Sequence, residues 1–284
     1  MKPLLAHTFE PHRVNYNIGV WLQDKLNGVR ALSQNGLFQS RDELPWSVDV
    51  LKHLSDYMKQ MFPSDWILDG ELYVHGWPLQ RINGAIAVNR SMARHDTELV
   101  EFHIFDRVSY GLPFEERYVN MVAERRGLIG ENIPIKFVRT IRVFNEWDAN
   151  DFYATAIAQK YEGIIYRIGD CPYTTPKQEG HNGRRRFLSD KNNRCWHMLK
   201  RKDWRDDEFV CIRVEEGEGK RSNMVGAFVC ETASGHYFGV GSGLTETEAI
   251  YYYENPPIGR KIKVKYLCLT SDGIPFNPSV IAVL

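Results

Sequence analysis

The sequence predicts an α+β protein of two domains, in which mostly antiparallel strands with a few helices precede a smaller, strand-rich domain. Three observations lead to this prediction. Apolar residues alternate in short runs bounded by Gly, Asn and Asp, which is typical of half-buried strands. Helical periodicity recurs without any regular strand–helix–strand unit or internal repeat. The composition changes near residue 203, after which short strands separated by Gly dominate.

The first domain begins with two strand-like runs on either side of Asn27-Gly28. An Asn-Gly pair between alternating apolar residues is the strongest short-range hairpin signal, because both residues tolerate positive φ. We therefore expect a hairpin there, and a second Asn-Gly pair follows at Asn35-Gly36. Further along, the patterns predict helices over 47–61 (capped by Ser47), 113–127 and 147–160, and strands over 66–74, 100–108 and 163–167.

The second domain is predicted from four strand-like runs, FVCIRV, GAFVCE, HYFGVG and RKIKVKYLCL. One short helix is inserted among them, with Thr245 and Glu248 placed as a capping box. Five or so strands and one helix in about eighty residues are typical of a small β-barrel of the OB type. We place the two domains at residues 1–203 and 204–284.

The composition is that of a globular protein, with 43% hydrophobic and 25% charged residues in a chain of 284. The sequence contains no apolar run long enough to cross a membrane. Its apolar start is too short, and too interrupted by His and Glu, for a signal peptide. We expect no membrane partner and a cytoplasmic location, in a bacterium or a phage-infected host.

The five cysteines are scattered along the chain at Cys171, Cys195, Cys211, Cys230 and Cys268. No two of them have C-x-x-C spacing, which argues against a structural zinc site and against a disulfide framework. We expect reduced thiols, several of them in the core.

Charge is balanced overall but uneven locally. Residues 177–202 contain nine Lys/Arg against two acids, a net charge of +7, whereas residues 204–284 contain eight Lys/Arg against eleven acids. A basic stretch in a neutral protein suggests a polyanionic partner bound by one surface, although a solvated loop has the same composition.

Six short motifs succeed one another along the chain. They are KLNGVR (Lys25 to Arg30), SRDE (Arg41), LDGEL (Asp69, Glu71), FHIFD (Phe105, Asp106), YEGIIYR (Glu162, Arg167) and MLKRK (Lys200, Lys202). In this order the chain resembles the small ATP-dependent DNA ligases of phage and bacterial type, within the covalent nucleotidyltransferase superfamily. That superfamily has K-x-D-G-x-R, D-G-E, an aromatic-Asp strand, E-G-x-x-x-[KR] and K-x-K. The resemblance implies an ATP-grasp-like nucleotidyltransferase domain followed by an OB-fold.

The resemblance implies that Lys25 is the nucleophile that carries AMP from ATP. Attack requires the neutral amine, and a free lysine titrates near 10.4. Lys200 and Lys202, two residues apart on a strand, would point the same way. They would neutralise the α-phosphate, and as neighbouring cations they would favour the neutral form of Lys25.

The remaining motif residues would surround the nucleotide. Glu71 and Glu162 match the family's acids at the ribose and at Mg²⁺, for which Mn²⁺ can substitute. Gln23 stands where the family often reads the adenine amino group, through its amide oxygen.

Apolar and basic side chains would complete that pocket. Phe105 matches the aromatic residue that stacks on adenine, and Ile165, or Ile164 beside it, would cover the opposite face. Arg30 and Arg41 would hold ribose or nick phosphates through their forked guanidinium groups.

The same resemblance implies that the basic stretch over residues 177–202 binds DNA. Arg184, Arg185 and Arg186 would contact the DNA backbone without reading bases. The expected partner is nicked double-stranded DNA, in replication or repair, and we expect a monomer. One departure is Asn27, where the family usually has Asp. A carboxylate there would favour the ammonium form of Lys25, so we expect Asn27 to ease its deprotonation.

Two other functions fit part of the pattern. RNA ligases and mRNA-capping guanylyltransferases share the motifs, but the OB-like second domain favours DNA. A decayed, nick-binding ligase is suggested by Asn27, whereas intact Lys25, Glu71 and Glu162 argue for catalysis. The sequence has no four-cysteine zinc module of the kind found in NAD-dependent ligases, which argues against that class.

We predict that replacing Arg184, Arg185 and Arg186 together with Ala weakens nick binding much more than self-adenylation. Each lost phosphate contact lowers the slope of log affinity against log salt by about one. Binding titrations over a range of salt concentrations would measure this slope, and an unchanged slope would identify the segment as a solvated loop.

Overall fold

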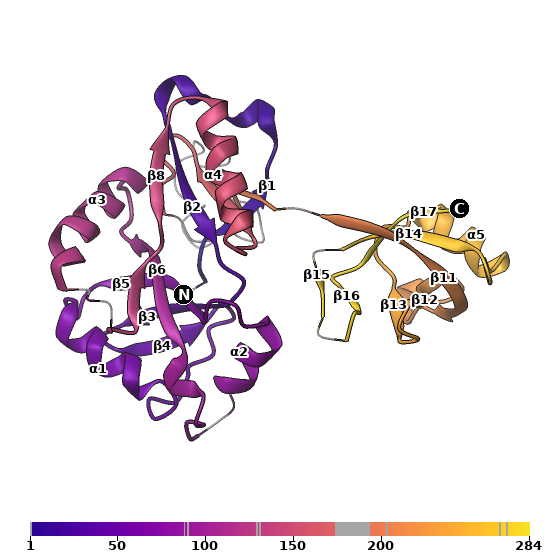
Figure 1. Ribbon diagram of the computed structural model, residues 1–284, viewed down its shortest axis with the longest axis horizontal. Coiled ribbons are helices and arrows are strands. Elements are labelled where there is room, and N and C mark those ends of the chain that lie inside the picture. The colour runs from indigo at the N-terminus through magenta and orange to yellow at the C-terminus, as the bar shows by residue number, and fades with distance from the viewer. Residues whose placement is uncertain are drawn as a thin grey trace. The chain divides into compact units, whose positions relative to one another are not determined.

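The chain forms an α+β structure, as predicted, and separates into two units, Met1–Lys202 and Asp203–Leu284 (Figure 1). No helix in the described part of the chain is both long and apolar enough to span a membrane. The residues described by the computed structural model are 2–87, 89, 91–128, 130, 132–173, 194–202, 204–266, 268–270 (backbone only at 268) and 272–284.

Two five-stranded sheets form the first unit, and their strands pair antiparallel except for β1 with β10 and β6 with β7. The β2 sheet has the order β1-β10-β9-β2-β8 and consists of β1 (Leu5–Thr8), β10 (Arg194–Arg201), β9 (Gly163–Arg167), β2 (Val20–Lys25) and β8 (Thr140–Val143). The β5 sheet has the order β4-β3-β5-β6-β7 and consists of β4 (Leu37–Ser40), β3 (Val29–Gln34), β5 (Ile67–Tyr73), β6 (Glu101–Val108) and β7 (Ile135–Phe137).

Four α-helices accompany these sheets in the part of the unit that the structure describes: α1 (Lys52–Met61), α2 (Leu79–Ala85), α3 (Phe114–Arg125) and α4 (Glu146–Ala158). One face of the β2 sheet packs on α4, because Leu22, Ile164 and Phe152 belong to one buried apolar cluster. Side chains alternate along a strand, so the residues on either side of Leu22 and Ile164 face the other way. That second face of the β2 sheet carries the polar residues described below.

The predicted helix over 47–61 begins later than expected. Ser47 is not its N-cap, because its carbonyl accepts the N–H of Val50 at 3.2 Å in a turn, and the helix starts at Lys52. The predicted helices near 113–127 and 147–160 are present as α3 and α4. The seven-residue α2 was not predicted, since it is short and contains Gly84.

The expected hairpin at Asn27-Gly28 is wrong. Strand β2 pairs with β8 and β9, whereas β3 pairs with β4 and β5, so these two residues carry the chain from one sheet to the other. Both residues are described, and neither has positive φ. A Cβ at Gly28 would lie 2.4 Å from the carbonyl oxygen of Leu72 and 2.7 Å from Cγ of Glu71. Glycine is therefore required for close approach to β5 and not for backbone conformation.

The second Asn-Gly pair forms the hairpin. Asn35 and Gly36 have φ values of 48° and 71°, and they join β3 to β4 directly after the paired residues Gln34 and Leu37. Positive φ at both central residues is the requirement of the type I′ turn, whose twist matches that of antiparallel strands.

In the second unit the described residues form a five-stranded sheet in the order β13-β12-β11-β14-β17, a two-stranded sheet and one α-helix. Thr245 and Glu248 form the predicted capping box at the start of the helix. Because β13 and β17 are the two ends of the sheet, its pairing is not closed into a barrel within the described residues. The elements are β11 (Arg205–Glu216), β12 (Val225–Glu231), β13 (Tyr237–Val240), α5 (Glu246–Glu254), β14 (Lys261–Tyr266), β15 (Cys268–Leu269), β16 (Pro275–Phe276) and β17 (Ser279–Val283).

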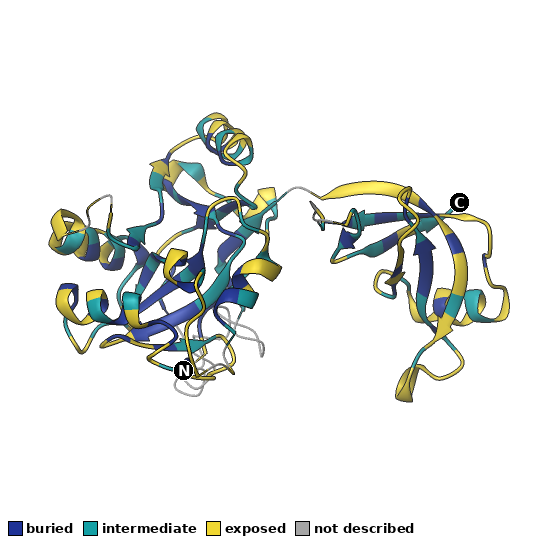
Figure 2. Ribbon diagram, turned by 60° about the horizontal axis from the view of Figure 1, so that its bottom comes forward, coloured by how far each residue is buried: buried dark blue, intermediate teal, exposed yellow. Residues whose placement is uncertain are grey.

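Each unit has its own apolar core, visible as the dark strands in Figure 2. In the second unit this core includes Phe228, Ile262 and Val264, all with no exposed surface. Alternation places Val210 and Ile212 of β11 outward, where each is 38% exposed.

We expect Gly28→Ala to destabilise the protein by about 1–3 kcal/mol, because the new methyl group would overlap backbone and side-chain atoms of β5. Gly84→Ala is the matched control. A Cβ at Gly84 meets nothing within 4 Å, and Ala favours a helix over Gly by up to about 1 kcal/mol. Urea unfolding measures the free energy of unfolding of both variants. Equal values would show that β5 can move to accommodate a methyl group at residue 28.

Candidate active site

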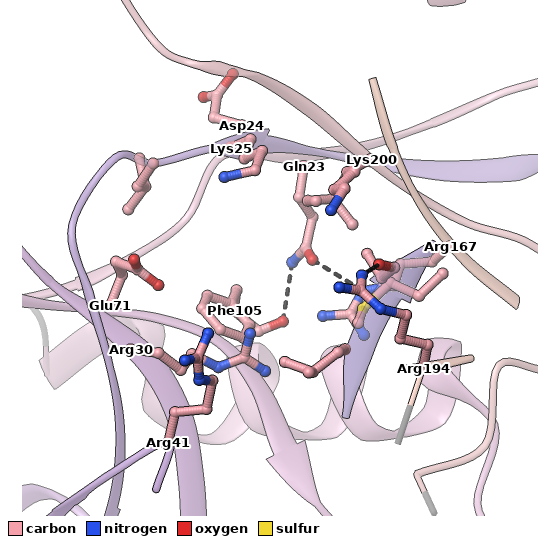
Figure 3. A pocket seen from close by; sticks show the side chains of 15 residues that line it. Gln23, Asp24, Lys25, Arg30, Arg41, Glu71, Phe105, Arg167, Arg194 and Lys200 are labelled. Carbon is pink, nitrogen blue, oxygen red and sulfur yellow. Dashed lines mark hydrogen bonds between the residues drawn. The ribbon is translucent and has the colours of Figure 1, made fainter. Parts of the chain in front are cut away.

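A cavity of about 260 Å³ lies in the first unit, with walls from both sheets (Figure 3). Its basic lining residues are Lys25, Arg30, Arg41, Arg167, Arg194 and Lys200. Asp24 and Glu71 are the acids in this lining, but the Asp24 carboxylate points away from the cavity to Arg139, at 2.7 and 2.8 Å. A concave site with this excess of positive charge attracts polyanions such as phosphates.

The β2 sheet contributes a row of three neighbours to one wall. Gln23 on β2 pairs with Ile165 on β9, which in turn pairs with Lys200 on β10. Lys25 lies two residues beyond Gln23 and so points to the same face. Ile164 faces the other way and is fully buried, so Ile165 is the isoleucine of this pair that lines the cavity.

A carboxylate is held between two ammonium groups at the end of β2. Glu162 accepts a hydrogen bond from Lys25 Nζ and a second from Lys202 Nζ at 3.0 Å. Its backbone N–H donates to the carbonyl of Lys25 at 3.0 Å, which fixes the two residues side by side. Burial alone would raise the pKa of Glu162, but the two lysines outweigh burial, and its pKa lies below the usual value.

The β5 sheet contributes the facing pair Arg30 and Glu71, which are opposite each other on β3 and β5. The Arg30 guanidinium group donates to both carboxylate oxygens of Asp69, at 2.6 and 2.7 Å. The Tyr173 hydroxyl donates to Asp69 as well, at 2.6 Å. Asp69 thus fixes the orientation of Arg30 while Glu71 remains a lining residue of the cavity.

Phe105 lines the cavity at a β-bulge. Asp69 pairs with Asp106 and Gly70 pairs with Ile104, so Phe105 is the extra residue on β6. Bulges are frequent beside active sites. The Phe105 ring lies under Arg30, whose Cζ is 4.4 Å from the ring centroid.

Two lining residues titrate near neutral pH. Burial raises the pKa of Glu71 to about 7, although Arg30 and Lys25 oppose this shift. Burial also lowers the pKa of Lys200 to about 8, and the neighbouring charge of Arg194 lowers it further. Perturbed groups gathered in one cleft are typical of functional sites.

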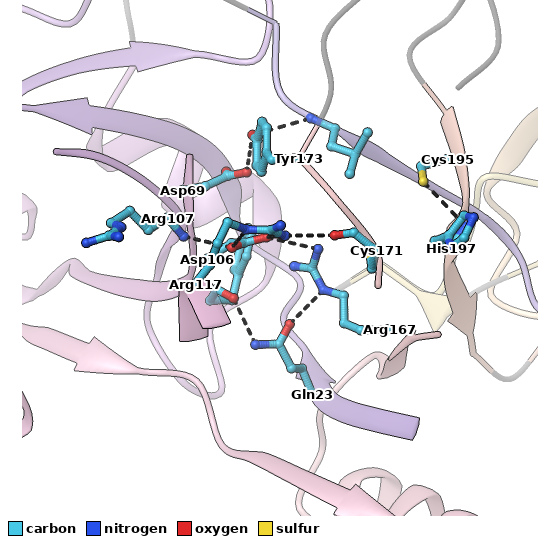
Figure 4. A network of polar contacts seen from close by, with 12 residues as sticks. Gln23, Asp69, Asp106, Arg107, Arg117, Arg167, Cys171, Tyr173, Cys195 and His197 are labelled. Atoms are coloured by element: carbon cyan, nitrogen blue, oxygen red, sulfur yellow. Dashed lines mark hydrogen bonds and ion pairs between the residues drawn. The ribbon is translucent and has the colours of Figure 1, made fainter. Parts of the chain in front are cut away.

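A network of polar contacts supports the cavity from behind (Figure 4). The Gln23 side chain donates to the carbonyl of Phe105 at 2.9 Å and accepts from Arg167 Nε at 3.1 Å. Arg167 also pairs with Asp106 at 3.2 Å. Arg117 of α3 binds the same carboxylate through two hydrogen bonds, at 2.8 and 2.9 Å. The network therefore joins both sheets and α3.

The structure places most of the predicted site residues at or beside the cavity. Glu162 and Lys202 form the ion-paired cluster with Lys25. Arg184, Arg185 and Arg186 lie outside the described residues. Sequence reasoning missed Arg194 and Met198, which also line the cavity and precede Lys200 on the same strand at even spacing. The predicted residues that line the cavity are Gln23, Lys25, Arg30, Arg41, Glu71, Phe105, Ile165 and Lys200.

Within the described residues, no group of three or more His, Cys, Asp or Glu side chains forms a metal site. Mg²⁺ does not need one, because it commonly binds one or two carboxylates together with substrate phosphates. Glu71 supplies a carboxylate in the cavity wall, and its pKa of about 7 leaves it ionised only near or above neutral pH. The donors present therefore fit a magnesium ion shared with phosphate.

Comparison with known families gives matches over both units. The family model for the ATP dependent DNA ligase domain matches residues 3–182, and that for the DNA ligase OB-like domain matches residues 216–283. The chain belongs to the ATP-dependent DNA ligases. It is therefore an enzyme of the ligase class, with a nucleotidyltransferase unit and an OB-like unit as the sequence predicted.

Curated relatives agree with this family. A DNA ligase of Haemophilus influenzae is 26% identical over 274 residues, which are 96% of this chain and 88% of that protein. A DNA ligase of African swine fever virus is 29% identical and covers 90% of this chain, which spans only 61% of the viral protein. Ligation of DNA with ATP is thus supported, and the RNA-ligase and capping alternatives are not favoured.

Solved structures show the same fold. A structure from a structure–function analysis of Lig E DNA ligases has a TM-score of 0.78 at 20% identity, and the match covers 100% of this chain and 99% of that chain. The Chlorella virus DNA ligase-adenylate has a TM-score of 0.54, also at 20% identity. At this identity the likeness concerns the fold alone.

Proposed function

We propose that this ligase seals 3′-hydroxyl/5′-phosphate nicks in duplex DNA, as a monomer, through a lysyl-AMP intermediate on Lys25. The observation that supports this most strongly is the Lys25–Glu162–Lys202 cluster at the edge of a cationic cavity. The hydrogen bond to Glu162 orients the Lys25 amine at this cavity, and a covalent nucleophile needs such positioning.

In the first step the neutral amine of Lys25 would attack the α-phosphorus of ATP, and pyrophosphate would leave. The ammonium form must first give up a proton, and the Glu162 carboxylate is the group already hydrogen-bonded to it. Lys202 holds the other oxygen of Glu162, so the carboxylate stays oriented while Lys25 reacts. In later steps AMP would pass to the DNA 5′-phosphate, and the 3′-hydroxyl would displace it.

The base of ATP would lie between Phe105 and Ile165. The first is presented by the bulge on β6 and the second by the cavity wall on β9. Gln23 lies in the same wall, but its amide oxygen already accepts a hydrogen bond from Arg167. A carbonyl oxygen has two acceptor sites, so one remains for the adenine amino group.

The phosphates would lie against Lys200, Arg30 and Arg41, with Glu71 as a ligand of Mg²⁺. The metal, when bound, would offset the charge that develops on the phosphate oxygens. Arg30 is pre-oriented by Asp69 and therefore loses little side-chain freedom on binding. Arg41 is exposed and contacts Asp42 at 3.7 Å, so it can reorient toward a phosphate.

Residues 1–203 would carry the adenylation chemistry, and residues 204–284 would contribute DNA binding. Outward apolar and charged residues of an OB-type sheet are a common nucleic-acid surface. The basic stretch that includes Arg184, Arg185 and Arg186 remains our candidate for contact with the DNA backbone.

We expect Lys25→Ala and Lys25→Arg both to abolish AMP labelling of the protein. Arginine keeps the positive charge beside Glu162 but offers no neutral amine, so the loss would be chemical and not structural. Intact-mass measurement after incubation with ATP and Mg²⁺ detects the added AMP. Lys220→Ala, at an exposed turn, serves as the control that retains labelling, and thermal melting checks the fold.

Adenylation at limiting ATP should fall as the pH rises above about 8, because Lys200 then loses the charge that binds phosphate. Such rates report ionisations of the free enzyme, and the decline should approach about tenfold per pH unit. Lys200→Arg keeps its charge throughout, so its profile should lack this decline even if its rate is lower. If the wild type and Lys200→Arg showed the same decline, Lys200 would not be the group that binds phosphate.

A further inference from the structure

The strand that carries Lys25 loses one of its two neighbours shortly before it ends. Lys25 is the last residue of β2. Gln23 is opposite Thr140, the first residue of β8. Among the described strands, the two residues after Gln23 pair with β9 alone. The position of Lys25 therefore depends on what contacts Asp24 on the side of β8.

Arg139, the residue directly before β8, provides this contact. Its guanidinium group donates to both carboxylate oxygens of Asp24, at 2.7 and 2.8 Å, which is the bidentate geometry of strong charge-assisted pairs. Its carbonyl accepts the backbone N–H of Asp24 at 3.3 Å. Its Cζ lies 4.2 Å from the ring centroid of Phe152 on α4. Arg139 therefore joins the end of β2 to the start of β8 and to α4.

The start of β8 holds two successive residues of β2, one on each face of the sheet. Because side chains alternate along a strand, Gln23 and Lys25 face the cavity while Asp24 points away from it (Figure 3). Thr140 accepts a hydrogen bond from the Gln23 amide at 3.0 Å. The Asp24 side chain is only 2% exposed, and a carboxylate buried to this extent is costly without its cation. The ion pair with Arg139 therefore opposes any change in the path of β2.

Glu162 holds Lys25 from the side of β9. It accepts a hydrogen bond from the Lys25 amine, and its backbone N–H donates to the Lys25 carbonyl. With Glu162 on one side and Arg139 on the other, the end of β2 is fixed in the plane of the sheet. In enzymes generally, displacing a reacting group by about 1 Å can lower the rate by about a hundredfold.

We propose that Arg139 is a positioning residue for adenylation: through Asp24 it holds the end of β2, so that the Lys25 amine meets the α-phosphate of ATP. This inference rests on the proposed role of Lys25 as the nucleophile. Arg139 is not among the described residues that line the cavity, so it acts through Asp24 and not on the nucleotide. Its loss should slow the transfer of AMP to Lys25 without weakening the binding of ATP.

Three variants separate position from charge and from stability. Arg139→Met removes the guanidinium group but keeps an unbranched side chain. Arg139→Lys keeps the positive charge, yet an ammonium group cannot bind both carboxylate oxygens in the forked geometry. Arg142→Met is the matched control. Arg142 is also a β8 arginine of similar exposure, 33% against 36%, but it is opposite Trp21 and pairs with Glu115 at 2.7 Å.

The measurement is single-turnover transfer of AMP from ATP, with Mg²⁺, to the full chain over a range of ATP concentrations. We expect Arg139→Met to lower the rate constant at saturating ATP by about 10- to 100-fold, and Arg139→Lys to lower it by less. The ATP concentration at half-maximal rate should change by less than about twofold, because ATP binding is retained. Arg142→Met should match the wild type in both quantities.

The final extent of labelling distinguishes positioning from folding. A partly unfolded variant reaches a lower final fraction of labelled protein at an unchanged rate constant, whereas a misplaced amine reaches full labelling slowly. The proposal is overturned if Arg139→Met keeps the wild-type rate constant, or if only its final extent of labelling or its half-saturating ATP concentration changes. It is also overturned if Arg142→Met slows labelling equally.

If Arg139→Met does not fold, Arg139→Lys decides by the same criteria, and a wild-type rate constant in that variant overturns the proposal. Peptide mapping of the labelled wild type locates the AMP. AMP on a residue other than Lys25 would overturn the proposed function as well, so the two failures are distinguishable.

Discussion

The fully buried carboxylate of Asp106 is the constraint on which the site depends. It stands on β6 of one sheet, pairs with Arg167 of the other sheet and binds Arg117 of α3. Burial would raise the pKa of Asp106, but the two guanidinium groups outweigh it, so its pKa lies below the usual value. In other proteins, removing one member of a buried ion pair costs about 3–5 kcal/mol. Through Gln23, the same network also sets the position of the strand that ends at Lys25.

Two glutamates of the first unit have pKa values that are shifted in opposite directions. Glu162 lies between two lysines and has a lowered pKa, whereas Glu71 is buried with weaker compensation and has a pKa of about 7. Environments that separate the pKa values of two carboxylates assign them different tasks. The ionised Glu162 suits the orientation of Lys25. Glu71 suits a metal ligand, because a bound metal ion would favour the ionised form of this carboxylate. The two pKa values differ because Glu71 lies within β5, whereas Glu162 precedes β9 and is fixed beside Lys25.

The membership of the cavity was largely predictable, because its residues come from short motifs at strand ends whose order is itself informative. Eight predicted residues line it, from Gln23 on β2 to Lys200 on β10. The local geometry was less predictable. Asn27-Gly28 has the sequence of a hairpin but joins two sheets, because hairpin formation also requires that the flanking strands pair with each other. Asn35-Gly36 meets that condition, and the same two letters there form the turn.

What the sequence could not reveal are contacts between residues far apart in the chain. The motif residue Asp69 is tied to Arg30 and to Tyr173, and no spacing rule connects the last two. Cys171 and Cys195 likewise belong to one buried apolar cluster with Leu4, which no pattern in the sequence predicts. Both arrangements border the same network around Asp106, since Arg117 also donates to the carbonyl of Cys171. The network that orders the wall of the cavity therefore also holds the backbone at Cys171.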